Sequence, residues 1–173
     1  WRVSRPRIPV VRQTAETDCA AACLTMVLAH YGKVVRLDDV RELLGIGRDG
    51  ADALSLLRGA RFHGLRARGV KVPELAGLRF LPPGSVLHWG FHHYVVLEWM
   101  DGEALHIVDP GSGRRSIALD EAGRRRSGEG AVEVDEVEPS GPVGDEAAGE
   151  LDGIPALERH RPAPPVGQAN GPP

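Results

Sequence analysis

The sequence predicts an α+β fold in which N-terminal helices pack on an antiparallel sheet. Helical patterns fill the first half of the region rich in apolar residues, and short strand patterns separated by Pro or Gly fill the second half. Helices that precede strands, rather than alternating with them, favour antiparallel pairing over a doubly wound sheet.

The chain of 173 residues is long enough for one domain with a stable core. Beyond about Pro139 it is a mixture of Pro, Gly, Ala and acidic residues with no aromatic residue. Such a composition buries too little apolar area to offset the entropy of ordering. We therefore expect a folded domain at residues 1–138 and a disordered Pro/Gly-rich tail at residues 139–173.

The first helix is expected to begin at Cys19, where Thr17 or Asp18 can cap it, and to end before Gly32 in a left-handed cap. Its buried stripe should run through Cys19, Cys23 and Val27. A second helix is expected over residues 37–44 and a third within residues 51–64. Strands are expected at residues 65–70, 85–89, 93–99, 103–109 and 114–119.

Cys19 is the candidate nucleophile. A helix start supplies unpaired backbone N–H groups and the positive end of the helix dipole, and both favour a reactive thiolate over a thiol. The ordinary interpretation of a lone cysteine is a small buried hydrophobe, so other residues have to raise it above that. Cys23 lies one turn along the same face, and we interpret it as a packed thiol.

His93 and Asp109 are the candidate base and orienting acid. A two-residue turn at residues 101–102 would place His93 and Asp109 on opposite faces of the hairpin, whereas a three-residue loop with Gly102 in the left-handed conformation would pair them directly. We prefer the second register because it gathers Val95, Leu97, Trp99, Leu105 and Ile107 on one apolar face and leaves Glu98 and His106 on the other. A carboxylate beside the imidazole would fix its tautomer.

Two other interpretations of these residues stay open. His88, His92 and His93 could form a metal cluster, although no Cys or Glu completes the set at ligand spacing. Asp109, which precedes Pro110 and Gly111, would on its own be an ordinary turn acid. Its position opposite His93 is what favours a catalytic role.

Four separated motifs now resemble one family. They are QTAETDCAAACLTMVLAHYGK at residues 13–33, RDG at residues 48–50, VLHWGFHHYVVLE at residues 86–98 and HIVDPGSGRR at residues 106–115. In this order and spacing they are similar to the bacteriocin-processing cysteine peptidase domain of peptidase-containing ABC transporters, over about residues 8–138. The resemblance implies a papain-like fold and cleavage of precursor peptides after a double-glycine leader, coupled to export.

Residue by residue, the resemblance places the family's nucleophile at Cys19, its base at His93, its orienting carboxylate at Asp109 and its oxyanion-hole glutamine at Gln13. It also implies a leader-bearing precursor peptide and ABC-transporter membrane and ATPase domains as partners. Two departures stand out: Ala20 replaces the usual glycine after the nucleophile, and His92 replaces the usual asparagine. Alternation along the strand favours His93 over His92 as the base.

Charge and composition exclude other classes. The net charge of −3 gives no reason to expect nucleic-acid binding. Two cysteines four residues apart make neither a disulfide framework nor a zinc site, so a reducing, cytoplasmic setting without cofactor or metal is expected. No stretch is long and apolar enough to cross a membrane. The resemblance nevertheless implies a place at the inner face of the cell membrane, through a transporter. A start at Trp1 suggests a domain cut from a longer polypeptide.

Two rival functions use the same fold. One is a non-catalytic domain that docks an export substrate, but such a domain should lack the nucleophile that this chain keeps. The other is a thiol acyltransferase, which incubation with amines would distinguish from a hydrolase.

Overall fold

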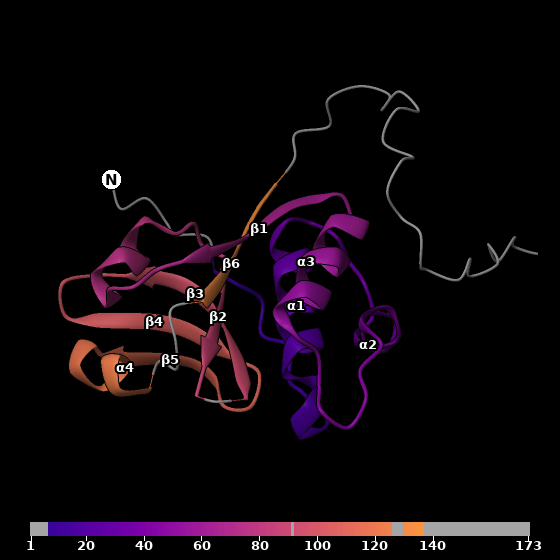
Figure 1. Ribbon diagram of the computed structural model, residues 1–173, viewed down its shortest axis with the longest axis horizontal. Coiled ribbons are helices and arrows are strands. Elements are labelled where there is room, and N and C mark those ends of the chain that lie inside the picture. The colour runs from indigo at the N-terminus through magenta and orange to yellow at the C-terminus, as the bar shows by residue number, and fades with distance from the viewer. Residues whose placement is uncertain (1–6, 91, 126–129, 137–173) are drawn as a thin grey trace, which may run out of the picture. The chain divides into compact units, whose positions relative to one another are not determined.

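The computed structural model describes residues 7–90, 92–125 and 130–136. The helices α1, α2 and α3 lie together on one side of an antiparallel sheet, as Figure 1 shows. The helical elements are η1 (Glu16–Asp18), α1 (Cys19–His30), α2 (Leu37–Leu44), α3 (Ala53–Phe62), η2 (Leu75–Phe80) and α4 (Leu119–Arg125). The strands are β1 (Leu65–Lys71), β2 (Val86–Trp89), β3 (His93–Met100), β4 (Ala104–Asp109), β5 (Gly113–Ala118) and β6 (Gly130–Glu136).

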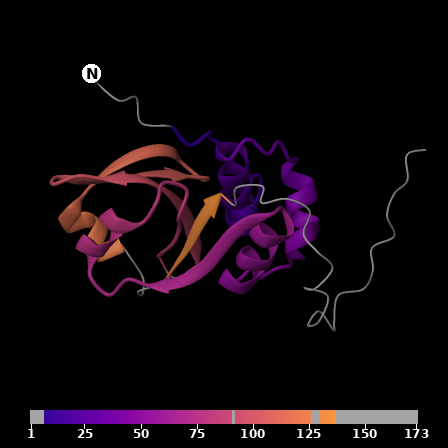
Figure 2. The same ribbon diagram turned by 90° about the horizontal axis from the view of Figure 1, so that it is seen from above.

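The sheet has the order β1-β6-β2-β3-β4-β5, and each of its neighbouring pairs is antiparallel. In Figure 2 the helices α1, α2 and α3 lie apart from most of the strands, and β1 runs from the sheet to these helices. The predicted α+β class and antiparallel sheet are confirmed.

Apolar layers lie on both faces of the sheet. Side chains such as Val86, Val96 and Val108 belong to the layer that contains α1, α2 and α3. Their neighbours in the strands, such as Leu87 and Leu97, belong to a second layer with η2 and α4. Successive strand residues point to opposite faces, so two buried layers require the nearly continuous apolar runs of β2 to β4.

α1 begins at Cys19, as predicted, and the left-handed glycine that follows its end is Gly32, with φ of +75°. The predicted single buried stripe is too narrow, because each residue from Cys19 to Leu28 is buried. A helix that is apolar all round is a central helix, and α1 packs against β3, α2 and α3. The second helix ends at Gly45 with φ of +62°, and a left-handed glycine, Gly64, follows the third, as expected.

The predicted strands correspond to β1 to β5, but η2, α4 and β6 were not predicted. β6 lies inside the sheet, between β1 and β2. Its sequence GAVEVDE alternates apolar and acidic residues, and Glu and Asp are depleted in strands. Pairing with β1 along all seven residues stabilises it in spite of that composition.

The predicted register of the β3–β4 hairpin is wrong. Val96 pairs with Val108 and Leu97 with Ile107, and the pairing shifts by one residue between Leu97 and Trp99. Gly102 does not have a positive φ, and the turn is instead held by Asp101, whose carboxylate accepts hydrogen bonds from the backbone N–H groups of the next strand's start.

This bulge changes what the residues beyond it contact. Trp99 leaves the predicted apolar face and stacks on His106, with ring centroids 4.5 Å apart. Glu98, expected on the opposite face, is buried, and its carboxylate accepts hydrogen bonds from Arg114 and from the backbone N–H of Ile8. A bulge is a common device for turning a side chain toward a new partner.

The predicted tail at residues 139–173 lies outside the described residues, so the division of the chain at residue 138 stays a prediction.

Candidate active site

Cys19 occupies the first position of α1, next to a cleft between the helices and the sheet. Its side chain is 5% exposed, and its Sγ lies 4.0 Å from the carbonyl oxygen of His92. The single turn η1 runs directly into α1, and Asp18 stands at the junction. The structure thus places the predicted nucleophile at a helix start, as the sequence indicated.

Asp18 does not cap α1 with its side chain, contrary to one of the two expected caps. Its carboxylate Oδ2 turns back and accepts hydrogen bonds from the Thr14 hydroxyl, at 2.6 Å, and the Ala15 N–H, at 2.9 Å. Its other oxygen forms an ion pair with Arg41 of α2, Nε to Oδ1 2.9 Å. The carboxylate is fully buried. Burial raises its pKa, but the bonds from Thr14 and Ala15 and the charge of Arg41 hold the pKa below its ordinary value.

His93, at the start of β3, contacts Asp109, at the end of β4. The distance from His93 Nε2 to Asp109 Oδ1 is 2.9 Å. In the observed register the residue across from Asp109 is Val95, so His93 reaches it diagonally, as long side chains on one face can. The predicted contact is therefore present although the predicted register is wrong. The predicted and observed registers differ by two residues, so His93 and Asp109 lie on the same face of the hairpin in both.

The hydrogen bond fixes the tautomer of the imidazole. A carboxylate only accepts, so Nε2 of His93 carries the hydrogen and Nδ1 is left for Cys19. The hydrogen bond to Asp109, followed by that with Cys19, raises the pKa of His93 from 6.5 to about 9, against the opposing effect of burial. Its protonated form is thereby stabilised beside the thiol.

Asp109 is held ionised by several donors. Burial alone would raise its pKa, but hydrogen bonds from His93, from the Ser112 hydroxyl at 2.8 Å and from the Gly111 N–H at 2.8 Å lower it far below its ordinary value. The turn after β4, which taken alone is an ordinary acid-capped turn, therefore orients this carboxylate toward the histidine.

Gln13 lies in the extended segment before η1 and lines the same cleft as Cys19 and His93. Its backbone N–H donates to the carbonyl oxygen of Pro110 at 3.1 Å. The side-chain Oε1 is buried near Gly111 and has no hydrogen-bond partner among the described residues. Gln13 lines the cleft, so its side-chain amide belongs to the candidate site.

The cleft around Cys19 has a volume of about 670 Å³. One wall is formed by Glu16, Thr17 and residues 48–51, and the other by Trp89, Gly90 and residues 92–94. The RDG segment, which the sequence singled out without assigning it a role, thus borders the candidate nucleophile. The φ of Gly50 is +77°, a backbone conformation that residues with a side chain rarely adopt, so a side chain there would be strained.

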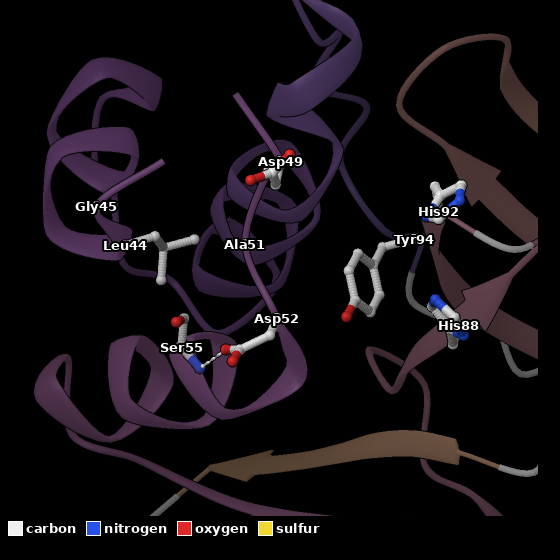
Figure 3. A pocket seen from close by; sticks show the side chains of 10 residues that line it. Leu44, Gly45, Asp49, Ala51, Asp52, Ser55, His88, His92 and Tyr94 are labelled. Atoms are coloured by element: carbon white, nitrogen blue, oxygen red, sulfur yellow. Dashed lines mark hydrogen bonds between the residues drawn. The ribbon is translucent and has the colours of Figure 1, made fainter. Parts of the chain in front are cut away.

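The cleft has a polar extension, with which it shares Asp49, His92 and Tyr94. Figure 3 shows the residues that line this extension. Asp49 and Asp52 come from the helical side, and His88, His92 and Tyr94 from the strand side. The carboxylate of Asp52 accepts from the Ser55 N–H at 2.7 Å and so caps α3. His92 points into the cleft away from Asp109, so of the two adjacent histidines His93 alone is hydrogen-bonded to that carboxylate.

An apolar cavity of about 500 Å³ adjoins the polar extension, with which it shares His88 and Tyr94. Its lining comes from α3 and from β1, β2 and β6: Ala53, Gly69, Val70, Lys71, Val86, Ala131 and Val132. Sequence reasoning missed this cavity, because it depends on β6 lying beside β1 and β2.

Ala20 and Cys23 turn away from the cleft into the core, where both side chains are fully buried. The methyl group of Ala20 therefore does not crowd the candidate nucleophile. Burial raises the pKa of Cys23 well above its ordinary value, and the two cysteines are free thiols. Among the described residues no group of three His, Cys, Asp or Glu side chains is arranged to hold a metal ion.

Helices that carry a cysteine, across a cleft from a sheet that carries a histidine–aspartate pair, are the architecture of papain-like cysteine peptidases. The chain belongs to the Peptidase C39 family, whose model matches residues 7–125. The family is one of cysteine peptidases, as the resemblance in the sequence implied.

Solved structures and curated relatives agree with this assignment. A double glycine motif protease from an AMS/PCAT transporter, solved in complex with the leader peptide, matches with a TM-score of 0.72 and 36% identity, over 79% of this chain and 96% of that one. The peptidase domain of Streptococcus ComA has the same fold, with a TM-score of 0.69, 23% identity and coverage of 76% and 100%.

Among curated proteins, the Escherichia coli colicin V secretion/processing ATP-binding protein is 34% identical over 122 residues, which are 70% of this chain and 17% of that protein. The probable microcin-H47 secretion/processing ATP-binding protein of the same species is 33% identical over 124 residues, 72% and 18% of the two chains. The chain thus spans less than a fifth of these relatives. None of the helices in the described residues is long and apolar enough to cross a membrane.

Proposed function

We propose that the chain is a cysteine endopeptidase that removes double-glycine-type leaders from bacteriocin or lanthipeptide-like precursor peptides. The observation that carries the proposal is the His93–Asp109 hydrogen bond beside Cys19, on the fold of a family of leader-processing peptidases. The similar double glycine motif protease was solved with a leader peptide, which supports the same class of substrate here.

In the proposed mechanism, Cys19 attacks the carbonyl carbon of the second glycine as a thiolate, with His93 protonated beside it. The oxyanion that forms accepts hydrogen bonds from the Cys19 backbone N–H and the Gln13 side-chain NH₂; losing one such donor typically costs about 3 kcal/mol. His93 then gives its proton to the departing amine. Water, activated by the neutral imidazole, hydrolyses the thioester and releases the leader.

The cleft supports small residues next to the cut. Its lining includes Gly50, Ala51 and Gly90, which carry little or no side chain, together with larger side chains such as Trp89 and Tyr94. The apolar cavity between α3 and the strands provides a place for apolar leader residues farther upstream, since an amphipathic helix can anchor itself in such a groove.

The partners we propose are the precursor peptide and the membrane and ATPase domains of an ABC transporter, fused or separate. The secretion/processing ATP-binding names of the curated relatives support this, as does the small part of their length that the chain matches. In that arrangement the peptidase works at the inner face of the cell membrane.

The test is incubation of the chain with a double-glycine leader peptide, followed by mass spectrometry. We expect one cut after the second glycine, lost in Cys19→Ala, which should still bind the leader. Binding without any cut by the unaltered chain would favour the non-catalytic docking alternative, and transfer of the leader to an added amine would favour an acyltransferase.

A further inference from the structure

Gln13 belongs to a segment, residues 8–15, that has no helix or strand of its own. A side chain on such a segment keeps its place only if other groups hold the backbone around it. The groups that do so here come from both layers of the fold.

Two buried carboxylates hold the two ends of this segment. At one end, Glu98 accepts from the Ile8 N–H at 3.0 Å, and Arg114 donates to the Ile8 carbonyl oxygen at 2.7 Å. At the other end, Asp18 accepts from the Thr14 hydroxyl and the Ala15 N–H through a single oxygen, Oδ2.

The middle of the segment is tied to the turn after Asp109. The Arg12 guanidinium donates to the Gly111 carbonyl oxygen at 2.8 Å, and the Gln13 N–H donates to that of Pro110 at 3.1 Å. These bonds fix Gln13 to the sheet, but they do not fix it to the helix that carries Cys19. That link is made by Asp18 alone among the side chains of η1, because its backbone joins Cys19 and its carboxylate holds Thr14.

We propose that Asp18 is a positioning residue that sets the place of the Gln13 amide relative to the Cys19 N–H, and so the width of the proposed oxyanion hole. The inference rests on the proposed function. Arg41 keeps the buried carboxylate oriented from α2. An isosteric amide cannot do the same work, because it loses the charge that Arg41 pairs with and one of its two oxygen acceptors.

The experiment measures leader hydrolysis by Asp18→Asn, Gln13→Ala and the double variant. We expect Gln13→Ala to lower kcat on the order of 10²-fold. Asp18→Asn should lower kcat about tenfold at unchanged KM, since a displaced donor weakens the transition state and not leader binding. The kcat of the double variant should be no more than about twofold below that of Gln13→Ala alone, because Asp18 acts on the reaction through Gln13.

Two further variants separate positioning from folding. Asp38→Asn removes the same charge beside the same arginine, whose Nη1 lies 3.6 Å from Asp38 Oδ1, but Asp38 does not contact residues 14–15, so its kcat should equal that of the unaltered chain. Thr14→Val removes one bond to Asp18 from an exposed position and should lower kcat severalfold, which keeps the proposal testable if Asp18→Asn does not fold.

Amide exchange supplies a measurement that does not depend on activity. The Ala15 N–H should exchange faster in Asp18→Asn, while the amides of α1 should not change. Three results in an otherwise active chain would overturn the inference. They are a loss of kcat in the double variant equal to the product of the two single losses, a rise in KM instead of a fall in kcat for Asp18→Asn, and unchanged exchange of the Ala15 N–H in that variant. An unaltered chain that hydrolyses no leader would overturn the proposed function and this inference with it.

Discussion

At the scale of single residues, the two cysteines differ in environment although they share one helix. Cys19 lines the cleft beside His93, whereas Cys23 is fully buried and its pKa is raised by desolvation. We expect iodoacetamide to label Cys19 much faster than Cys23, because Cys19 borders the cleft whereas burial keeps Cys23 out of reach and in the unreactive thiol form. The check is peptide mapping after timed alkylation; equal labelling of both thiols would contradict the assignment of the nucleophile.

The His93–Asp109 pair predicts a pH dependence of stability. The pKa of His93 is raised from 6.5 to about 9, so its contribution is complete below about pH 6.5 and is lost as the pH rises through 9. The pKa of Asp109 is lowered from 3.8, so its contribution to stability is present above about pH 3.8 and is lost as the pH falls further. The difference in Tm between the unaltered chain and His93→Gln should therefore be largest between about pH 4 and 6.5. A difference that grows toward pH 9 would contradict this.

The neighbouring histidines supply a matched comparison. We expect His93→Ala to abolish turnover and His92→Ala and His88→Ala to leave most of it, because of the three only His93 is hydrogen-bonded to Asp109. A chelator should not change the rate of leader cleavage. An inactive His92→Ala beside an active His93→Ala, or activity that zinc restores after chelation, would revive the alternatives that the sequence left open.

The placement of single residues was the part of the candidate site that the sequence predicted best, and their catalytic roles stay a proposal. The positions of Cys19 and of the His93–Asp109 pair follow from a helix start and from alternation along strands, both of which are local. Asp18 could not be assigned in the same way. A helix cap is the usual role of an aspartate before a helix, and the competing bonds to Thr14 and Ala15 depend on how the chain folds back before η1.

At the scale of elements, the bulge in β3 is the main difference between the predicted and the observed β3–β4 hairpin. Glu98 lies between the two registers and is buried, and it links β3, β5 and the N-terminal segment through Arg114 and Ile8. We expect Glu98→Ala to lower the free energy of unfolding by about 3 kcal/mol, because it leaves the buried Ile8 N–H without an acceptor and Arg114 without its carboxylate partner. Urea denaturation measures this free energy. The control is Glu103→Ala, which removes a carboxylate from an exposed position and should change the free energy of unfolding by no more than about 0.5 kcal/mol.

The elements themselves were largely predictable, and their arrangement was not. Glycines with positive φ mark the ends of the three helices, and apolar runs mark β2 to β4, so local patterns locate them. The bulge and the insertion of β6 between β1 and β2 are set by pairing partners far away in the sequence. Patterns within a single strand carry no information about such partners.

At the scale of the whole molecule, the cleft, its polar extension and the apolar cavity adjoin one another, from Cys19 to the strands β1 and β6. An extended peptide with small residues at the cut and apolar residues upstream fits this succession. We expect Ala53→Trp, which fills the apolar cavity from the exposed start of α3, to raise KM for a leader at nearly unchanged kcat, since the substitution removes binding and leaves the reacting groups in place. An equal fall in kcat would show that the cavity does not serve the leader.

The cleft also predicts strict selection at the bond itself. Replacing the Gly-Gly pair before the cut with Leu-Leu should lower kcat/KM by a factor that corresponds to more than the roughly 1–3 kcal/mol of a single methylene mismatch, because bulky side chains there would have to displace lining residues such as Trp89 and Tyr94, which pack on the core. Removing residues 139–173 should leave kcat/KM unchanged for both leaders, since that sequence has no aromatic residue with which to complete a cleft. The measurement compares kcat/KM for the full and shortened chains on both leaders. Similar rates on Gly-Gly and Leu-Leu would refute the steric argument, and a large loss on shortening would show that the tail contributes to the site.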